Sequence, residues 1–495
     1  MSKTAALGAV SAFALAGCVT QPEMLTQSDR EEFSDFLTDA AFADQEPITG
    51  PLSLPEAMAR ALKYNLDHRV SMMEASLAAR DADFSRYDLL PQLVVNSAYY
   101  ARDKEPGASS RSLITRRQSL EPSQSTEQYG FASDLTLSWS ILDFGLSYIR
   151  AKQLGDEALI AEERRRKAIN ETMQDVRAAY WRAASAQRLS DQLNALQQQV
   201  EDAFLDSREL FEARRTAPLS ALTYQRELTE IQAEAQALEL ELVSAKRELA
   251  RLMNLPMGMD FEVIVPSRQE ATPEFSMRLG DAMEVALENR PEIREAAYRV
   301  RMGDRAMKEA VLEALPGIDL YAGYNYDTND FLFNDDWVAY GAKASWNLLK
   351  VFNAPDRYDR AAARAGIERE RALATAVAVT SQVHISLMRY EKLRDTLDTA
   401  KQANDVQAEI LDQIEAGATS GQVSEQTLVR ERMNKIVTEA RYDLAYAEVQ
   451  EAFAALYAAV GYDPFGNDIT GREGVGTVAE SLSLLWNERE APAAP

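Results

Sequence analysis

The strongest constraint on the fold is that the chain repeats itself. Residues 52–65 and 277–290 follow one pattern at a spacing of 225 residues. Five positions of the first stretch recur with identical residues in the second: Leu54, Ala57, Met58, Ala61 and Leu62. The same spacing relates further landmarks: Leu90-Pro91 to Leu315-Pro316, and Tyr99 to Tyr324. Because internal repetition is typical of a duplicated structural unit, the two halves are expected to fold alike.

The first copy is longer than the second in one place. Ser138-Trp139 matches Ser345-Trp346 at a spacing of 207 residues, so 18 additional residues lie between Tyr99 and Trp139. Further along, a spacing of 204 residues relates another set: Thr223, Arg226, Glu227 and Leu252 to Thr427, Arg430, Glu431 and Leu456. The match therefore extends through the whole length of each copy.

Each copy predicts a helix, a strand, a loop, a strand, a very long helix, a turn and a second long helix. The first helical run covers about residues 53–89 and stops before Pro91. We expect strands at about 92–101 and 130–142, and again at about 317–327 and 336–348. In the second strand Phe131, Leu135 and Leu137 alternate with polar or small residues, which is the period of a strand with one apolar face.

The long helices show coiled-coil spacing. One seam steps by three and four residues through Ile169, Met173, Val176, Tyr180 and Ala183. A helix over about 146–213 is roughly 100 Å long, more than a compact domain requires. The turns at 214–218 and 417–421 are then expected together at one far end.

The N-terminus resembles a secretory signal over residues 1–17. Leu15-Ala16-Gly17-Cys18 resembles the bacterial lipobox, so the single cysteine, Cys18, is expected to be acylated, with palmitate among its acyl chains. Residues 18–50 are then an extended tether, and the tail, 464–495, is expected to be disordered. An ordinary signal peptide with an incidental cysteine is the alternative.

Composition excludes several classes of function. Lys and Arg number 53 against 78 Asp and Glu, a formal net charge of −25, which disfavours a nucleic-acid partner. One cysteine and two histidines leave few ligands for a metal, and no constellation of nucleophile and base is visible. We therefore expect neither an enzyme nor a bound cofactor or metal.

Four amphipathic strands of about ten residues suit a transmembrane barrel, but the smallest single-chain barrels have eight strands. Several chains must then share one barrel. The alternative is that the strands form a soluble domain.

Together, the lipobox, the duplicated order of elements, the helix-closing Leu-Pro pairs and residues 138–145, SWSILDFG, resemble the TolC-like outer-membrane efflux family, particularly its lipidated branch. The resemblance implies a mainly α fold with a membrane β-barrel portion. Each chain then consists of two tandem repeats, 51–262 and 277–463. Three identical chains form a homotrimer with one 12-stranded barrel that continues into a helical periplasmic tunnel.

It also implies a passive exit duct in the outer membrane, anchored by lipid. Its partners are a periplasmic adaptor and an inner-membrane transporter, in tripartite efflux or type I secretion. The sequence names neither the substrate nor the pump. A periplasmic lipoprotein coiled-coil scaffold without a channel is the rival hypothesis.

The family places its periplasmic gate and adaptor contacts at the tips of the helical hairpins. Here that resemblance points to nine candidates: Arg214, Arg215, Thr216, Leu219, Ser220, Thr419, Val423, Ser424 and Glu425. The aspartate rings of some members are not evident, and Ser424 and Glu425 stand near the expected place.

Overall fold

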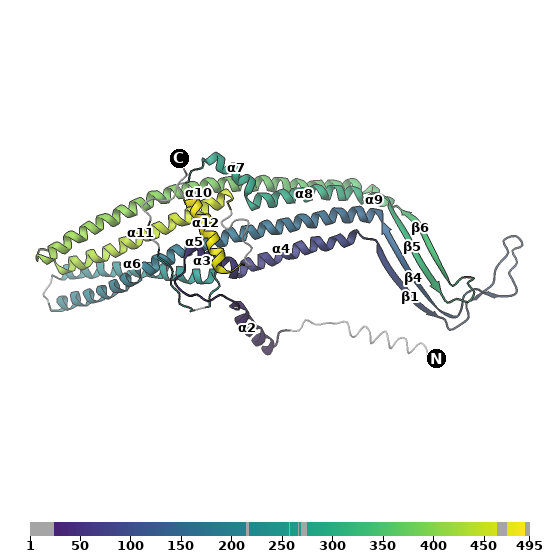
Figure 1. The fold of residues 1–495 in the computed structure, drawn as a ribbon, viewed down its shortest axis with the longest axis horizontal. Coiled ribbons are helices and arrows are strands. Elements are labelled where there is room, and N and C mark those ends of the chain that lie inside the picture. The colour runs from purple at the N-terminus through teal and green to yellow at the C-terminus, as the bar shows by residue number, and fades with distance from the viewer. Residues whose placement is uncertain are drawn as a thin grey trace.

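The computed structural model describes residues 24–213, 217–256, 258–265, 267–268, 275–462 and 473–490. The molecule is long and narrow, with its strands at one end and the tips of two helical hairpins at the other (Figure 1). Cys18, and the parts of the signal and tether before Met24, lie outside the described residues.

The predicted order of elements is observed in both copies. The first consists of α3 (Leu54–Tyr64), α4 (Leu66–Phe84), the 3-10 helix η1 (Ser85–Leu89), β1 (Gln92–Ala101), β4 (Tyr129–Ser140), α5 (Ile141–Glu212) and α6 (Pro218–Leu252). The second consists of α7 (Leu279–Asn289), α8 (Pro291–Leu312), β5 (Gly317–Asp327), β6 (Asp336–Ser345), α9 (Leu348–Phe352), α10 (Ala354–Thr419) and α11 (Glu425–Val460). The strand β6 ends at Ser345 rather than at 348, because α9 begins at Leu348 with Asn347 as its N-cap.

The first helical run is divided into two helices. Asn65 is both the C-cap of α3 and the N-cap of α4, where its side chain accepts a hydrogen bond from the His68 amide at 3.0 Å. In the second copy Pro291 begins α8 directly after the C-cap of α7. An amide side chain at a cap and a proline at a first turn are both ordinary helix starts, so the two copies break at the same place by different means.

The four long strands form one antiparallel sheet in the order β1-β4-β5-β6. The helices attached to them form a layer with the same order, in which α4 packs on α5, α5 on α8 and α8 on α10. Consequently β1 and α4 lie at one edge of the molecule, and β6 and α10 lie at the other.

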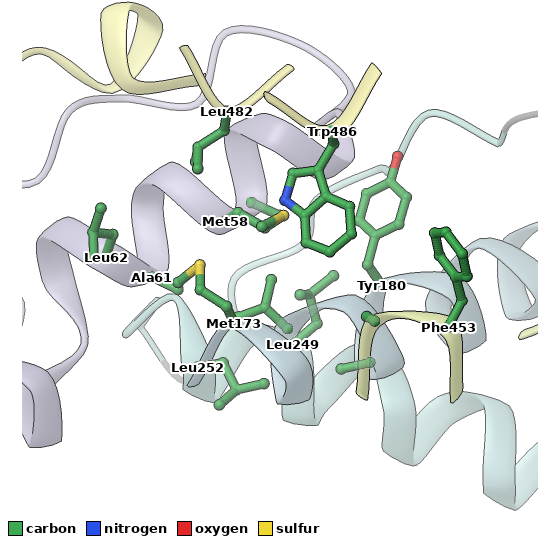
Figure 2. Packing of buried hydrophobic residues seen from close by; sticks show 14 of the residues in the cluster. Met58, Ala61, Leu62, Met173, Tyr180, Leu249, Leu252, Phe453, Leu482 and Trp486 are labelled. Atoms are coloured by element: carbon green, nitrogen blue, oxygen red, sulfur yellow. The ribbon is translucent and has the colours of Figure 1, made fainter. Parts of the chain in front are cut away.

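A large apolar core lies at the waist of the molecule. It combines residues of both repeats, including Met58 of α3, Met173 of α5, Leu249 of α6 and Phe453 of α11 (Figure 2). The Tyr180 hydroxyl lies within hydrogen-bonding distance of two backbone carbonyl oxygens, Leu52 at 3.1 Å and Ile264 at 2.7 Å. Burying a large apolar side chain contributes about 1.5–3 kcal/mol, so this core is the main link between the copies.

The predicted disorder of the tail is wrong for residues 475–490. They form helix α12 (Val475–Glu490), which packs on α3 and completes the core at the waist. Its buried residues are Val475, Val478, Leu482 and Trp486, which follow a helical period. The guanidinium of Arg177 lies 3.8 Å from the centre of the Trp486 ring, a cation–π contact that fixes the end of α12.

The tether is also not uniformly extended. Residues 27–41 form helix α2 (Gln27–Ala41), started by a capping box between Thr26 and Asp29, and none of its side chains is buried. Its C-terminal end is held at the waist, because the Asn254 side chain donates to the Ala41 carbonyl at 2.6 Å. Local capping explains a helix that the acidic composition alone did not predict.

Charged pairs join the two repeats between the waist and the sheet. The Asp156 carboxylate of α5 is buried and pairs with both Arg301 and Arg305 of α8. Nearby, burial opposes ionisation of Glu295, yet hydrogen bonds from two arginines, Arg299 and Arg164, hold its pKa below the ordinary value. This part of the α5–α8 contact therefore depends on ion pairs, whereas the waist depends on apolar packing.

Toward the hairpin tips, a second and smaller apolar cluster continues the predicted seam. It contains Leu189, Leu193, Leu196 and Val200 of α5, with residues of α6 and α11 packed against them.

No helix among the described residues is both long and apolar enough to cross a bilayer.

Candidate functional site

One face of the sheet is apolar and exposed. The register places Val95, Leu135, Tyr324 and Val338 in one row across the four strands. Their exposed fractions are 67%, 42%, 48% and 65%. The neighbouring row on the same face is Leu93, Leu137, Ala322 and Tyr340. An apolar face spanning four strands is larger than the patches that monomeric soluble proteins ordinarily expose, which marks it as a contact surface.

The opposite face is polar. Asn96, Asp134 and Asn325 lie in one row, which Trp337 of β6 completes, and the Asn96 side chain donates to the Asp134 carboxylate at 3.1 Å. The Thr136 hydroxyl donates to the same carboxylate oxygen at 2.8 Å. Three rows nearer the helices, on the same face, Asp319 lies opposite Lys343. A face of carboxylates, amides and hydroxyls is suited to water, so the two faces require different environments.

Tyrosines on the polar face lie against glycines of the neighbouring strand. Tyr100 is paired with Gly130 and Tyr321 with Gly341. A side-chain carbon at Gly130 would lie 2.5 Å from the Tyr100 hydroxyl oxygen, and one at Gly341 would lie 2.6 Å from that of Tyr321. The glycines thus make room for the rings, an arrangement that pins strand register.

Both edges of the molecule carry unpartnered groups. Within the described chain β1 pairs only with β4, and β6 only with β5. The helices at the same edges expose apolar side chains. On α4 these are Leu66, Val70, Met73, Leu77 and Phe84; on α10 they are Ile367, Leu373, Val377, Ile385 and Met388. Each edge of the molecule thus combines an open strand, whose backbone groups can pair with another strand, with exposed apolar side chains on the adjoining helix.

The tip of the second hairpin is a compact turn. Gly421 has a φ of 73°, and the Gln422 amide donates to the Gly417 carbonyl at 2.9 Å. A side-chain carbon at Gly417 would lie 2.6 Å from Val423 Cγ2. Ser424 then caps α11, since its hydroxyl accepts from the Thr427 amide at 3.2 Å. Only glycine adopts the left-handed conformation without cost, so this turn is built by its sequence.

The tip of the first hairpin is only partly described. Arg214, Arg215 and Thr216 lie outside the described residues, as does the side chain of Glu425 at the start of α11. Leu219 is 78% exposed in the first turn of α6, and Ser220 beside it is exposed. Thr419 and Ser424 are exposed in the second tip, and Val423 is half-buried there. The described candidates thus lie in two tips at the same end of the molecule (Figure 1).

Behind the tips, ion pairs connect the two hairpins. Arg430 of α11 lies 3.6 Å from Glu227 of α6, and these residues occupy positions that recur in both copies. Arg441 of α11 also pairs with Glu234 of α6. Sequence reasoning found the recurring positions but assigned them no partner, because a cross-hairpin pair depends on how the copies pack.

A more buried clasp lies nearer the waist. The Asp443 carboxylate of α11 is 1% exposed and binds Arg188 of α5 and Arg268 of the segment that joins the repeats. The Arg268 guanidinium also lies 4.6 Å from the centre of the Tyr442 ring. Burial disfavours its charge, but hydrogen bonds to Asp443 and Glu439 raise the pKa of Arg268. A buried carboxylate held by two arginines is costly to separate from either one.

The described residues contain no group of three His, Cys, Asp or Glu side chains that could hold a metal ion. His68 is buried, with its Nδ1 2.7 Å from the Leu62 carbonyl oxygen, and burial lowers the pKa of its ring. That contact joins the start of α4 to the last turn of α3, so His68 has a structural role there.

Known proteins share this geometry. The family model described as outer membrane efflux protein matches residues 282–462, from α7 to the end of α11. A comparison with curated protein sequences gives no match. The structure is similar to the CmeC outer membrane channel of Campylobacter jejuni, at 13% identity and a TM-score of 0.66, over 94% of this chain and 98% of that one.

Two further solved structures are similar. The outer membrane protein VceC of Vibrio cholerae gives 15% identity and a TM-score of 0.62, over 82% of this chain and 96% of that one. The open state of the MtrE outer membrane channel of Neisseria gonorrhoeae gives 16% identity and a TM-score of 0.60, over 85% and 94%.

The fold is therefore that of the outer-membrane channels. Within that class, two findings confirm the resemblance to the TolC-like outer-membrane efflux family. The outer membrane efflux protein model matches residues of the second repeat, and the whole fold is similar to that of solved channels. Members of this family are channels rather than enzymes.

Proposed function

We propose that the chain is the outer-membrane exit duct of a tripartite efflux or type I secretion system. In this proposal three copies close a 12-stranded barrel and a helical tunnel, and substrate passes through both without chemical change. The observation that carries the proposal is the four-stranded sheet, with one exposed apolar face, one polar face and two open edges.

The dimensions of the sheet support a membrane span. Its strands have 10 to 12 residues. At about 3.4 Å per residue they are about 34–41 Å long, and a tilt of about 45° reduces their height to about 24–29 Å. The apolar band of a membrane barrel is about 25 Å tall. Aromatic rings flank the apolar face, with Tyr99 and Phe131 near the loop end and Trp139 against Phe144 near the helix end.

The edges support closure by identical chains. Because every neighbouring pair in the sheet is antiparallel and the strands number four, β6 of one copy next to β1 of another continues the antiparallel alternation. The same rotation brings α10 of one copy to α4 of the next, which covers their exposed apolar stripes. One interface repeated by rotation then closes the ring and leaves no edge, as a barrel in lipid requires.

The hairpin tips are the proposed contacts for a periplasmic adaptor, through which an inner-membrane transporter is reached. The proposal includes all nine tip candidates named from the sequence. Its support is the place of the described candidates at the end of the molecule farthest from the sheet, and the exposure of Leu219 beside the exposed Ser220. The helix α5, with 72 residues, is about 108 Å long, which is a suitable reach for a duct that meets its pump across the periplasm.

Residues 1–17 are the proposed signal peptide, and Cys18 is the proposed site of acylation in the outer membrane. Incorporation of radiolabelled palmitate into the wild-type chain, and its loss in Cys18→Ala, tests this part separately. Because the strands span the membrane in this proposal, Cys18→Ala is expected to keep the trimer.

The proposal is tested by purifying the detergent-extracted protein, measuring its oligomeric mass and recording conductance in planar bilayers. A trimer with a small, mostly closed conductance is expected. A monomer that stays in water after removal of the acyl chains and gives no conductance would overturn the duct, and would favour the rival scaffold hypothesis.

A further inference from the structure

The loop between β1 and β4 contains a hairpin that the duplicated fold does not need. The second copy joins its equivalent strands, β5 and β6, with residues 328–335 alone, whereas the first uses residues 102–128. The 18 additional residues between the strand landmarks of the first copy fall in this loop. Because eight residues suffice to connect such strands, the extra segment is not needed to close the turn.

The hairpin is ordered by its own hydrogen bonds. Its base is the pairing of β2 (Gly107–Ala108) with β3 (Ser123–Gln124). Further out, the Ser119 amide donates to the Ser110 carbonyl at 2.8 Å, and the Ser112 amide donates to the Arg117 carbonyl at 2.9 Å. The stem is fixed to the shorter loop, since the buried Asn329 side chain donates to the Ser125 carbonyl at 3.2 Å. The hairpin therefore projects beyond the strand ends in a defined direction (Figure 1).

The outer half of this hairpin is basic in an acidic chain. Residues 109–120, which follow β2, contain Arg111, Arg116 and Arg117 and no Asp or Glu before Glu121, although the whole chain has a net charge of −25. The Arg111 guanidinium donates to the Arg116 carbonyl at 2.9 Å, which holds two of the three arginines together. All three are exposed. Guanidinium groups bind phosphate oxygens through two parallel hydrogen bonds, and they do so better than lysine.

Apolar side chains lie among these arginines. Leu113, Ile114 and Leu120 are 84%, 94% and 99% exposed. A loop facing only water gains nothing from three such side chains, and a nucleic acid or a soluble anion would not cover them. Arginines beside exposed leucine and isoleucine match an amphiphile that carries both phosphates and acyl chains.

We infer that this hairpin, residues 107–124, binds phosphorylated glycolipid of the outer leaflet around the barrel. The inference rests on the proposed function, which places the loop end of the sheet at the outer surface. The arginines bind the phosphates, and the apolar side chains contact the region where the acyl chains begin. The acidic loop at 328–335 of a neighbouring copy is the competing partner, and the experiment below separates the two.

The experiment measures lipid A retained by the detergent-purified full-length oligomer, using native mass spectrometry and titration with lipid A as the probe. Dephosphorylated lipid A is the control ligand. The variant replaces Arg111, Arg116 and Arg117 by Gln together, and Lys104→Gln in the stem of the same loop is the matched control. We expect wild type and Lys104→Gln to bind lipid A alike. We expect the triple variant to bind about tenfold more weakly or worse, since charge-assisted bonds to phosphate are lost.

A second variant, Leu113→Ser with Ile114→Ser, is expected to weaken the binding of lipid A as well. Its trimer mass and conductance are expected to remain as in wild type. Equal binding of phosphorylated and dephosphorylated lipid A, or a triple arginine variant that binds normally, would overturn the inference. If the arginine variant instead lowers the temperature at which the trimer dissociates and leaves lipid binding intact, the partner is the neighbouring copy and the inference is also overturned. A wild-type chain that neither trimerises nor conducts overturns the proposed function, and the inference with it.

Discussion

A one-residue shift along β4 tests whether the apolar face meets lipid. Leu137 lies on the apolar face and Ser138, its neighbour, lies on the polar face. In Leu137→Arg, a guanidinium is placed on the apolar face between the middle of β4 and its helix end. Arginine on the lipid face of a barrel costs about 2–4 kcal/mol at the midplane, and little near the interfaces. At the intermediate depth of Leu137 the cost is about 1–2 kcal/mol per copy, so three copies in one trimer lose about 3–6 kcal/mol. That is a large share of the roughly 5–15 kcal/mol by which an ordinary domain is stable.

The matched control is Ser138→Arg, which adds the same side chain to the same strand on the water-facing side. We expect Leu137→Arg to abolish heat-resistant trimers in the outer-membrane fraction, and Ser138→Arg to retain them. Membrane fractionation followed by gel electrophoresis with and without heating measures both. If both variants insert equally, or if only Ser138→Arg fails, the assignment of the faces is refuted, because adjacent strand residues must point to opposite sides.

Three further predictions concern the helical part. Burial lowers the pKa of His68, so as the pH drops below about 6.5 the unfolded chain binds a proton on this ring before the folded chain does, and stability falls. The variant His68→Gln is expected to lose less thermal stability than wild type between pH 7.5 and pH 5.5. An equal loss in both would contradict the argument. Trp486→Ala removes a buried ring that packs on Arg177 and is expected to cost about 3–5 kcal/mol, seen as a lower melting temperature and faster proteolysis of α12; unchanged proteolysis would show that α12 is held by other contacts. Gly421→Ala forces a side chain into a left-handed turn at a cost of about 1–2 kcal/mol, so export is expected to decrease while trimer yield stays normal, and normal export would separate the turn from function.

The sequence predicted most of the architecture because repetition and periodicity are local signals. The strands lie within three residues of the expected ends, and the seam through Ile169 and Met173 is buried. The helix α12 was missed although the same signal was present, since Val475, Val478 and Leu482 already show a helical spacing. The prediction of disorder rested on the alanine- and proline-rich ending at residues 491–495, which follows the helical spacing rather than interrupting it.

Other features have no local signal. The clasp brings together Asp443, Arg188 and Arg268, three residues from separate segments that meet only when the two repeats pack. The pair of Arg430 and Glu227 is of the same kind. Of the tip candidates, the turn at Gly421 follows from its sequence, whereas contact with an adaptor stays a prediction.

The way the two repeats are joined changes along the molecule, and this bears on how the proposed duct opens. At the sheet they share a ladder of backbone hydrogen bonds between β4 and β5, and at the waist they share the large apolar core. Toward the tips the links are a smaller apolar cluster, the buried Asp443 clasp and then half-exposed ion pairs such as Arg430 with Glu227. Exposed ion pairs contribute about 0–1 kcal/mol each, far less than a buried core. The free energy needed to separate the repeats therefore rises from the tips to the waist, so the tips can part while the sheet remains closed.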